Sequence, residues 1–306
     1  MRLWLTFLVC VALLAAAAPK SRRMLVRIPV WSDSGGPLTA KDLVAEADGE
    51  PARVVRLRGP SDDLFILLVV DLAEDLNEAD LAKDALVQTI SALPRNVYVS
   101  VLRAQDGLRV LLDPTNDRDA ITQTIRAFPV SGKAGLLETV ETASELADSI
   151  LAKAPVRLAV LYVTDSNVYN YREDFSNPVI NYSDRRDLSR RFPEGLVRER
   201  IAKLQAKLSA RQAPIFVVHL EYRTDRLNEA YQNGLMELTA TTGGSSAFCR
   251  SNSEIATAIQ QMFRKIASHY RVDLQVAARN GADVQISLQA ASGPLSYRAR
   301  VHLKKR

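Results

Sequence analysis

The chain has 306 residues, of which 47% are hydrophobic and 25% are charged, and its formal net charge is +5. This composition is typical of a globular protein with room for one large domain or two modest ones. Its basic residues are scattered and form no concentrated stripe, which argues against nucleic-acid binding. The chain has two cysteines and three histidines. Because the histidines lie far apart in the sequence, nothing suggests a zinc site or a catalytic triad.

Residues 1–18 have the pattern of a secretory signal peptide. Arg2 precedes an uncharged run, Leu3–Ala18, which ends in small residues that fit an Ala-x-Ala cleavage pattern. The run is shorter than the roughly 20 residues of a membrane-spanning helix. Lys20 and Arg22 follow the run, and positive charge there can hinder export, so an uncleaved segment that attaches the protein to a membrane is the alternative. We expect a secreted or cell-envelope protein.

Residues 24–60 are expected to form an N-terminal β segment. Met24–Trp31 reads as a strand, and its proline places it near a sheet edge. Leu43–Ala47 leads into Asp48-Gly49, which is a two-residue hairpin signal, and Pro51–Leu57 returns as the next strand.

Residues 61–268 alternate between strands and helices and are expected to form one α/β domain. Short apolar runs without polar alternation are typical of strands buried on both faces of a parallel sheet. The sequence therefore predicts a doubly wound, mostly parallel sheet flanked by helices, a Rossmann-like architecture. Strands are expected at Leu64–Val70, Asn96–Arg103, Leu108–Leu112, Arg157–Val163 and Pro214–Leu220, and helices from Leu76 and over Asp117–Phe128, Leu136–Ala154, Leu196–Leu208, Leu227–Leu238 and Ile255–Ile266.

Residues 269–306 return to β structure, with strands expected at Tyr270–Ala277, Val284–Ala290 and Leu295–His302. Because such short β pieces cannot form a stable sheet alone, we expect this segment to pair with residues 24–60 in a small antiparallel β-sandwich beside the core. Between the two flanks, residues 166–193 show no hydrophobic period. A loop of that length inside a compact domain is usually functional or disordered.

The core resembles a von Willebrand factor type A (VWA) domain. The resemblance rests on a buried strand that ends at Asp71, a glycine-led helix start at Gly132–Leu136, a buried strand that ends at Thr164-Asp165, and a late Thr242-Gly243-Gly244. The flanks, with a glycine-rich turn and Leu-Thr after Val30, resemble those of the VWA-related family described from acidobacteria.

The resemblance implies a metal-ion-dependent adhesion site at the ends of the strands. In the family this site is Asp-x-Ser-x-Ser, with a threonine and an aspartate from two other loops. This sequence has Asp71 and Asp165 at the two aspartate positions, Ala73 and Asp75 at the serine positions, and Ala134 at the threonine position. The site is therefore degenerate. Either Asp71, Asp75 and Asp165 hold Mg²⁺ or another divalent cation, or the two aspartates are remnants hydrogen-bonded to loop amides and helix N-termini.

The resemblance, the export signal and the missing catalytic groups favour a protein-interaction module over an enzyme. The expected contact residues for an unknown protein partner are Asp71, Asp75, Ala134, Asp165, Tyr169 and Tyr171, and the same loop also holds Phe175, Tyr182 and Phe192. No small-molecule substrate is expected. One alternative is a metal-assisted hydrolase that uses Asp71, Asp75 and Asp165, although no base or nucleophile is placed by a motif. The other is a structural subunit of the cell envelope.

Overall fold

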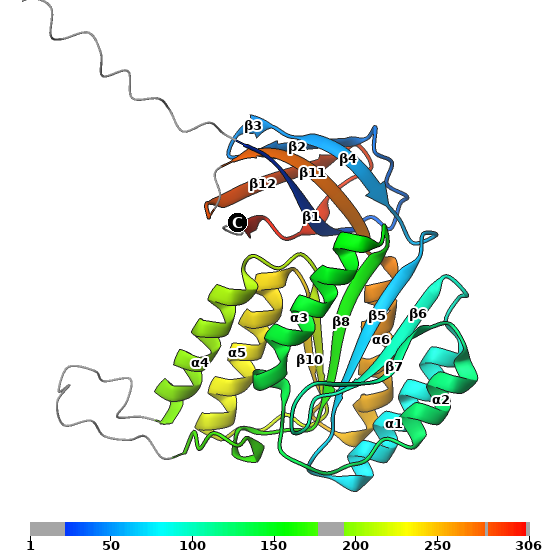
Figure 1. Cartoon of the computed structure of the whole chain (residues 1–306), viewed down its shortest axis with the longest axis vertical. Coiled ribbons are helices and arrows are strands. Elements are labelled where there is room, and N and C mark those ends of the chain that lie inside the picture. Colours follow the sequence, from blue (N-terminus) through cyan, green and yellow to red (C-terminus); the bar gives the residue numbers. More distant parts are fainter. Residues whose placement is uncertain (1–21, 177–192, 279–280, 304–306) are drawn as a thin grey trace, which may run out of the picture.

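The computed structural model describes residues 22–176, 193–278 and 281–303. The expected signal peptide, Tyr182 and Phe192 lie outside these residues. Figure 1 shows a central sheet between two layers of helices, which we call the α/β body, with a smaller all-β part at one end, which we call the β unit. Both flanks of the chain lie in the β unit, and the α/β body holds the middle of the chain.

The α/β body is built on a six-stranded sheet in the order β10-β9-β8-β5-β6-β7. Neighbouring strands are parallel except β7, which runs antiparallel to β6. The central strand β5 is buried on both faces, because alternate residues face the two helix layers. The strands are β5 (Leu64–Asp71), β6 (Val97–Arg103), β7 (Arg109–Thr115), β8 (Arg157–Thr164), β9 (Ile215–His219) and β10 (Ser246–Phe248).

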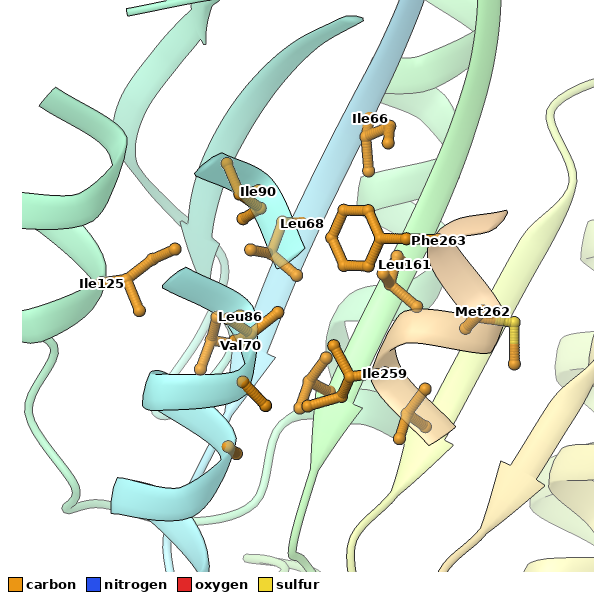
Figure 2. Close-up of a cluster of buried hydrophobic side chains, with 14 of the residues drawn as sticks. Ile66, Leu68, Val70, Leu86, Ile90, Ile125, Leu161, Ile259, Met262 and Phe263 are labelled. Carbon is orange, nitrogen blue, oxygen red and sulfur yellow. The ribbon is translucent and has the colours of Figure 1, made fainter. Parts of the chain in front are cut away.

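Each face of the sheet packs on three helices. One face buries a cluster with α1 (Leu76–Ser91), α2 (Arg118–Arg126) and α6 (Ile255–Ser268). Figure 2 shows part of this cluster, in which Leu68 of β5 lies between helix residues such as Leu86 and Phe263. The other face packs on α3 (Leu136–Lys153), α4 (Pro193–Leu208) and α5 (Arg226–Thr242). The expected doubly wound α/β fold is confirmed. None of the described helices is long and apolar enough to span a membrane.

The β unit contains two four-stranded antiparallel sheets in the orders β13-β1-β11-β4 and β14-β12-β2-β3. Strands from the two ends of the chain pair directly, and both sheets contribute to one hydrophobic cluster. At the expected hairpin, Asp48 and Gly49 both have positive φ values, as a type I′ turn requires. The strands are β1 (Arg22–Ser32), β2 (Leu43–Ala47), β3 (Glu50–Pro51), β4 (Arg53–Arg58), β11 (Tyr270–Ala278), β12 (Asp283–Ala290), β13 (Leu295–Tyr297) and β14 (Arg300–His302).

The prediction of a single strand over Leu295–His302 is wrong, because this segment is divided between the two sheets. β13 pairs with β1, whereas β14 pairs with β12. Between them, the Arg298 side chain is 7% exposed and donates to the backbone carbonyls of Arg211 and Ser209 in the α/β body. The chain thus leaves one sheet, anchors on the α/β body through a buried arginine, and enters the other sheet.

Buried arginines also connect the β unit to the α/β body at the start of β8. Arg157 is 1% exposed and donates to the carbonyls of Ala267, His269, Pro60 and Asp62 at 2.8–3.0 Å. Four backbone acceptors from two separate segments therefore share one guanidinium. Since β5 and β8 both begin at this junction, the carboxyl ends of the sheet lie at the opposite end of the α/β body (Figure 1).

Candidate functional site

The candidate site lies at the carboxyl ends of β5 and β8. These parallel strands end side by side, with Asp71 in register with Thr164. The backbone N–H of Asp165 donates to the carbonyl oxygen of Asp71 at 3.3 Å. The structure therefore brings together Asp71 and Asp165, the two aspartates that the sequence placed at one edge of the sheet. In doubly wound sheets this edge is where ligands commonly bind.

The carboxylate of Asp71 is fully buried and is surrounded by hydrogen-bond donors. It accepts from the backbone N–H groups of Gly135 and Leu136 at 3.0–3.2 Å, at the N-terminus of α3. It also accepts from the hydroxyls of Thr164 at 3.3 Å and Ser166 at 3.2 Å. A negative charge at a helix N-terminus is favoured by the free N–H groups and the helix dipole. Asp71 thus fastens the start of α3 to the end of β5.

Gly135 is required for this contact. A Cβ atom at this position would lie 1.9 Å from the backbone oxygen of Ala104, so only glycine lets the loop approach the sheet closely enough for its N–H to reach Asp71. The glycine-led helix start that the sequence singled out therefore has a structural reason. Neighbouring Ala134 is fully buried, and its N–H donates to the carbonyl of Asn170 at 3.0 Å.

Asp165 holds the other loop of the site. Its carboxylate accepts from three successive backbone N–H groups, those of Ala73 at 2.8 Å, Glu74 at 2.9 Å and Asp75 at 3.2 Å. The Asp75 carboxylate is not part of this contact. It caps α1 and accepts from the N–H groups of Asn77 and Glu78, as short acidic side chains commonly do at the N-cap position. The Asp75 carboxylate therefore caps its own helix, and it takes no part in the hydrogen bonds that the carboxylates of Asp71 and Asp165 accept.

Burial determines the protonation of these groups. Desolvation raises the pKa of Asp71 to about 7; the donors from Gly135 and Leu136 oppose this rise, and the nearby charge of Asp165 adds to it. Burial also raises the pKa of Asp165 against its three N–H donors. His219, at the end of β9, is fully buried beside the carbonyl of Ser166, and desolvation lowers its pKa to about 4. It is therefore a neutral core histidine.

The described arrangement of these residues differs from that of an octahedral cation site. A hard cation needs about six oxygen ligands, and here the oxygens of Asp71 and Asp165 accept hydrogen bonds from protein donors that a cation would have to displace. Ala73 and Ala134 bring no side-chain oxygen, and the Asp75 carboxylate faces its helix. Across the described part of the chain, no group of three or more His, Cys, Asp or Glu side chains is arranged to hold a metal.

The predicted contact residues divide into buried and exposed ones. Asp71, Ala134, Asp165 and Tyr171 are at most 4% exposed. The Tyr171 hydroxyl lies 2.8 Å from that of Tyr231, and its ring packs edge-on against Phe175, so this part of the loop folds back into the core. Tyr169, in contrast, is 55% exposed, and Asp75 is exposed too.

Sequence reasoning missed an exposed patch on the same edge. Leu76 at the start of α1 is 66% exposed, and Tyr222 after β9 is 37% exposed. Arg223, which follows Tyr222, forms ion pairs with Glu74 at 2.7 Å and Glu221 at 2.6 Å, and the first of these joins the loop of Tyr222 to the loop that leads into α1. We call Leu76, Tyr169 and Tyr222, with the charged residues Glu74, Glu221 and Arg223, the edge patch. The sequence held one signal for this patch, because Leu76 is an apolar residue directly after Asp75, the N-cap residue of α1.

Comparisons with known proteins concern the fold. No protein-family model and no curated protein matches the chain. Among solved structures, it is similar to a von Willebrand factor type A protein from Catenulispora acidiphila, at 10% identity over 94% of this chain and 74% of that one, with a TM-score of 0.48. It is also similar to BatB from Bacteroides thetaiotaomicron, at 17% identity over 68% of this chain and 99% of that one, with a TM-score of 0.40.

A third similar structure is an aerotolerance-related membrane protein from Bacteroides fragilis, at 16% identity over 66% of this chain and 99% of that one, with a TM-score of 0.41. The similar structures thus include one that is described as a von Willebrand factor type A protein, the family that the sequence resembles. At these identities and scores, the similarity assigns no ligand, metal or partner to this chain. The α/β architecture is established by the strand order described above.

Proposed function

We propose that this chain is an exported protein-interaction module whose protein partner docks on the edge patch. The supporting observation is the exposure of Leu76 and Tyr169, which are 66% and 55% exposed, at the sheet edge that holds the buried carboxylates of Asp71 and Asp165. Tyrosine and arginine are enriched among the residues that dominate binding energy in interfaces, and exposed apolar side chains rimmed by polar residues mark interaction sites.

We further infer that Asp71 and Asp165 work as anchors of the edge patch and need no metal. Asp165 holds the loop that carries Glu74, next to Leu76, and Asp71 holds the start of α3. The Asn167 side chain, two residues before Tyr169, donates to the Glu74 carboxylate at 2.7 Å. The loops that present Leu76 and Tyr169 are therefore held in fixed positions before a partner binds. Such preorganisation reduces the entropy lost on association.

Export is the second part of the proposal, and it rests on the uncharged run Leu3–Ala18. The first described strand, β1, begins at Arg22 in the β unit, at the end of the molecule opposite the edge patch (Figure 1). An N-terminal segment that stays attached to a membrane would join the described chain at the end of the molecule opposite the edge patch. A cleaved protein would present the same patch in solution.

Site-specific photo-crosslinking tests the docking surface. A photoreactive phenylalanine analogue replaces Tyr169 or Leu76 in the full chain, which is expressed in its native host and irradiated. The control position is Val44, which is 61% exposed on β2 in the β unit. We expect the same crosslinked protein from Tyr169 and Leu76, and none of it from Val44.

A second arm uses the matched substitutions Leu76→Asp and Val44→Asp. The proposal predicts that Leu76→Asp abolishes crosslinking from position 169, because it places a charge at the centre of the contact, while Val44→Asp leaves it unchanged. Equal crosslinking from all three positions, or an unchanged yield with Leu76→Asp, would remove the edge patch from the interface.

A further inference from the structure

One sheet of the β unit, in the order β13-β1-β11-β4, has a face that the other sheet does not cover. Val26 and Ile28 of β1 point into the hydrophobic cluster of the β unit. Because side chains alternate along a strand, Arg23, Leu25 and Arg27 lie on the opposite face, which we call the outer face. On β11, the positions paired with these three residues are Ala277, Gln275 and Asp273.

On β4, side-chain burial identifies the residues of the outer face. The register of β4 against β11 shifts at Val55, so pairing alone does not assign the faces beyond that point. Val54 and Leu57, on the two sides of the shift, both pack against the hydrophobic cluster. Val55 is 49% exposed, and Arg53 and Arg56 are exposed too. β4 therefore presents these three residues on the outer face.

Except for one buried aspartate, the charged side chains of the outer face are arginines. The four strands contain a single acidic residue, Asp273, which is buried in an ion pair with Arg271 at 2.8 Å. Arg23, Arg53 and Arg56 are exposed, and within residues 22–176, 193–278 and 281–303 their side chains have no hydrogen bond or ion pair. Basic residues that are scattered in the sequence thus gather on one face of the folded chain.

The α/β body covers part of the outer face. Arg27 donates to the Gln212 side chain at 2.6 Å, and Arg271 donates to the backbone carbonyl of Val156. Leu25, two residues nearer the start of β1 than Arg27, is 42% exposed. The part that stays exposed is a patch of basic and apolar side chains, which we call the arginine face: Arg23, Leu25, Arg53, Val55 and Arg56.

The arginine face adjoins the start of the described chain. Three residues, Pro19–Ser21, separate the uncharged run Leu3–Ala18 from β1, and Arg23 is the second residue of β1. Because an extended residue spans at most about 3.6 Å, a membrane that holds this run lies within roughly 18 Å of Arg23. Guanidinium groups form paired hydrogen bonds with phosphate oxygens, and basic residues beside an apolar membrane segment attract anionic lipids. An apolar segment and a basic patch together hold a protein on a membrane more firmly than either does alone.

We propose that the arginine face binds the surface of an anionic membrane beside the N-terminal run, with Arg23, Arg53 and Arg56 contacting lipid phosphate groups. The exposed side chains of Leu25 and Val55 fit this environment, because apolar groups gain free energy by burial at the boundary between headgroups and acyl chains. The β unit, which carries the arginine face, lies at the end of the molecule opposite the edge patch (Figure 1). The edge patch stays free for a protein partner, and neither proposal depends on the other.

Vesicle flotation of the full chain tests the charge requirement. Vesicles of phosphatidylcholine alone are compared with vesicles that also contain phosphatidylglycerol, because the apolar run contributes to binding on both and the arginine face only on the second. The variant with Arg53→Glu and Arg56→Glu is matched with one carrying Arg109→Glu and Arg126→Glu, which makes the same change in net charge at two exposed residues of the α/β body. We expect the wild type and this control to bind the mixed vesicles at least about tenfold more tightly than the first variant does. The variant with Arg53→Lys and Arg56→Lys keeps both charges and should retain most of the wild-type binding.

Lipid photo-labelling locates the contact and does not depend on how well the charge variants fold. A photoreactive phenylalanine analogue replaces Leu25 or, as the control, Val44, which is 61% exposed on the other sheet of the β unit. We expect lipid adducts from position 25 on the mixed vesicles and few from position 44. Equal labelling at the two positions, equal binding of the wild type to both kinds of vesicle, or an equal loss in the control variant would each overturn the proposal. Unchanged binding with Arg53→Glu and Arg56→Glu would overturn it too, and would favour an acidic protein segment as the occupant of this face.

Discussion

The backbone N–H of Asp165 donates to the carbonyl oxygen of Asp71 at 3.3 Å, yet the two carboxylates hold different loops. Asp71 binds the start of α3, and Asp165 binds the start of the loop that leads into α1. In a cation site, both side chains would turn toward a shared centre. Here each aspartate ties a crossover loop to the sheet, and together they fix the edge on which the edge patch lies.

The first prediction concerns the anchoring role of Asp71. In Asp71→Asn, one carboxylate oxygen becomes an NH₂ group that faces other donors, so buried N–H groups of the α3 start lose an acceptor. We expect the free energy of unfolding near neutral pH to fall by about 2–3 kcal/mol, as measured by urea denaturation. Asp113→Asn is the control, since Asp113 is exposed, and it should change stability little. Equal effects of the two substitutions would contradict the anchoring role.

The pKa of Asp71 leads to a pH prediction. Its pKa in the folded protein, about 7, is raised above the ordinary value of 3.8. The folded state therefore holds this proton more tightly than the unfolded state does, and the resulting stabilisation is complete below the unfolded pKa and is lost as the pH rises through about 7. We expect the stability difference between wild type and Asp71→Asn to shrink by roughly 3 kcal/mol between about pH 5 and about pH 8.

Urea denaturation of both proteins across this range measures that difference. Other groups, such as Glu78, whose pKa is also raised to about 7, are present in both proteins, so their contributions cancel in the comparison. A difference that stays constant with pH would show that Asp71 does not titrate in this range.

Much of this architecture could be predicted from hydrophobic pattern. The continuous apolar run Leu64–Val70 indicated a strand covered on both faces, and helices packed on both faces of β5 are what the structure has. The pattern failed where a long-range contact decides the structure. Arg298 divides the last strand because it reaches carbonyls of Ser209 and Arg211, nearly ninety residues away, and no local periodicity carries that information. The three-residue strand β10 was too short to show a period.

The candidate site was predictable in position but not in detail. Parallel strands that end in Asp71 and Thr164 had to place their carboxyl ends together. The donors to each carboxylate come from backbone N–H groups, which every sequence has, so the sequence could not distinguish an anchor from a ligand. Tyr169 and Tyr171 are neighbours in a loop of similar composition. Only the packing of Tyr171 against Tyr231 and Phe175 separates the buried tyrosine from the exposed one.

The third prediction concerns Gly135. The Cβ atom of Gly135→Ala would meet the carbonyl of Ala104 at 1.9 Å, so the loop must move away from the sheet and from Asp71. We expect a loss of about 3 kcal/mol in unfolding free energy. Gly36→Ala is the matched control, because its Cβ atom would lie 3.7 Å from the nearest atom, the Ser34 hydroxyl oxygen. If Gly135→Ala were as stable as Gly36→Ala, close approach of this loop would not be needed.

The fourth prediction concerns the junction between the β unit and the α/β body. In Arg157→Met, four backbone carbonyls lose their shared donor, and we expect a loss of at least about 3 kcal/mol. Hydrogen exchange should show faster amide exchange at the junction, in β11 and at the end of α6, before it changes in β5. The comparison is Arg126→Met, which removes an ion pair whose partners are 60% and 62% exposed and should cost little. Uniform exchange throughout the molecule would argue against a junction held by Arg157.

The last prediction concerns metal binding, and it separates the two interpretations of the degenerate adhesion site. Mg²⁺, Mn²⁺ and Ca²⁺ are each titrated into the wild type and into Asp71→Ala, with binding heat as the readout. Because both Asp71 oxygens and both Asp165 oxygens already accept protein hydrogen bonds, a cation would have to displace donors from two loops at once. We therefore expect the same small heats from both proteins. A saturable heat in the wild type that disappears in Asp71→Ala would show that these carboxylates leave their loops to bind a cation, and would refute the anchoring role proposed for them.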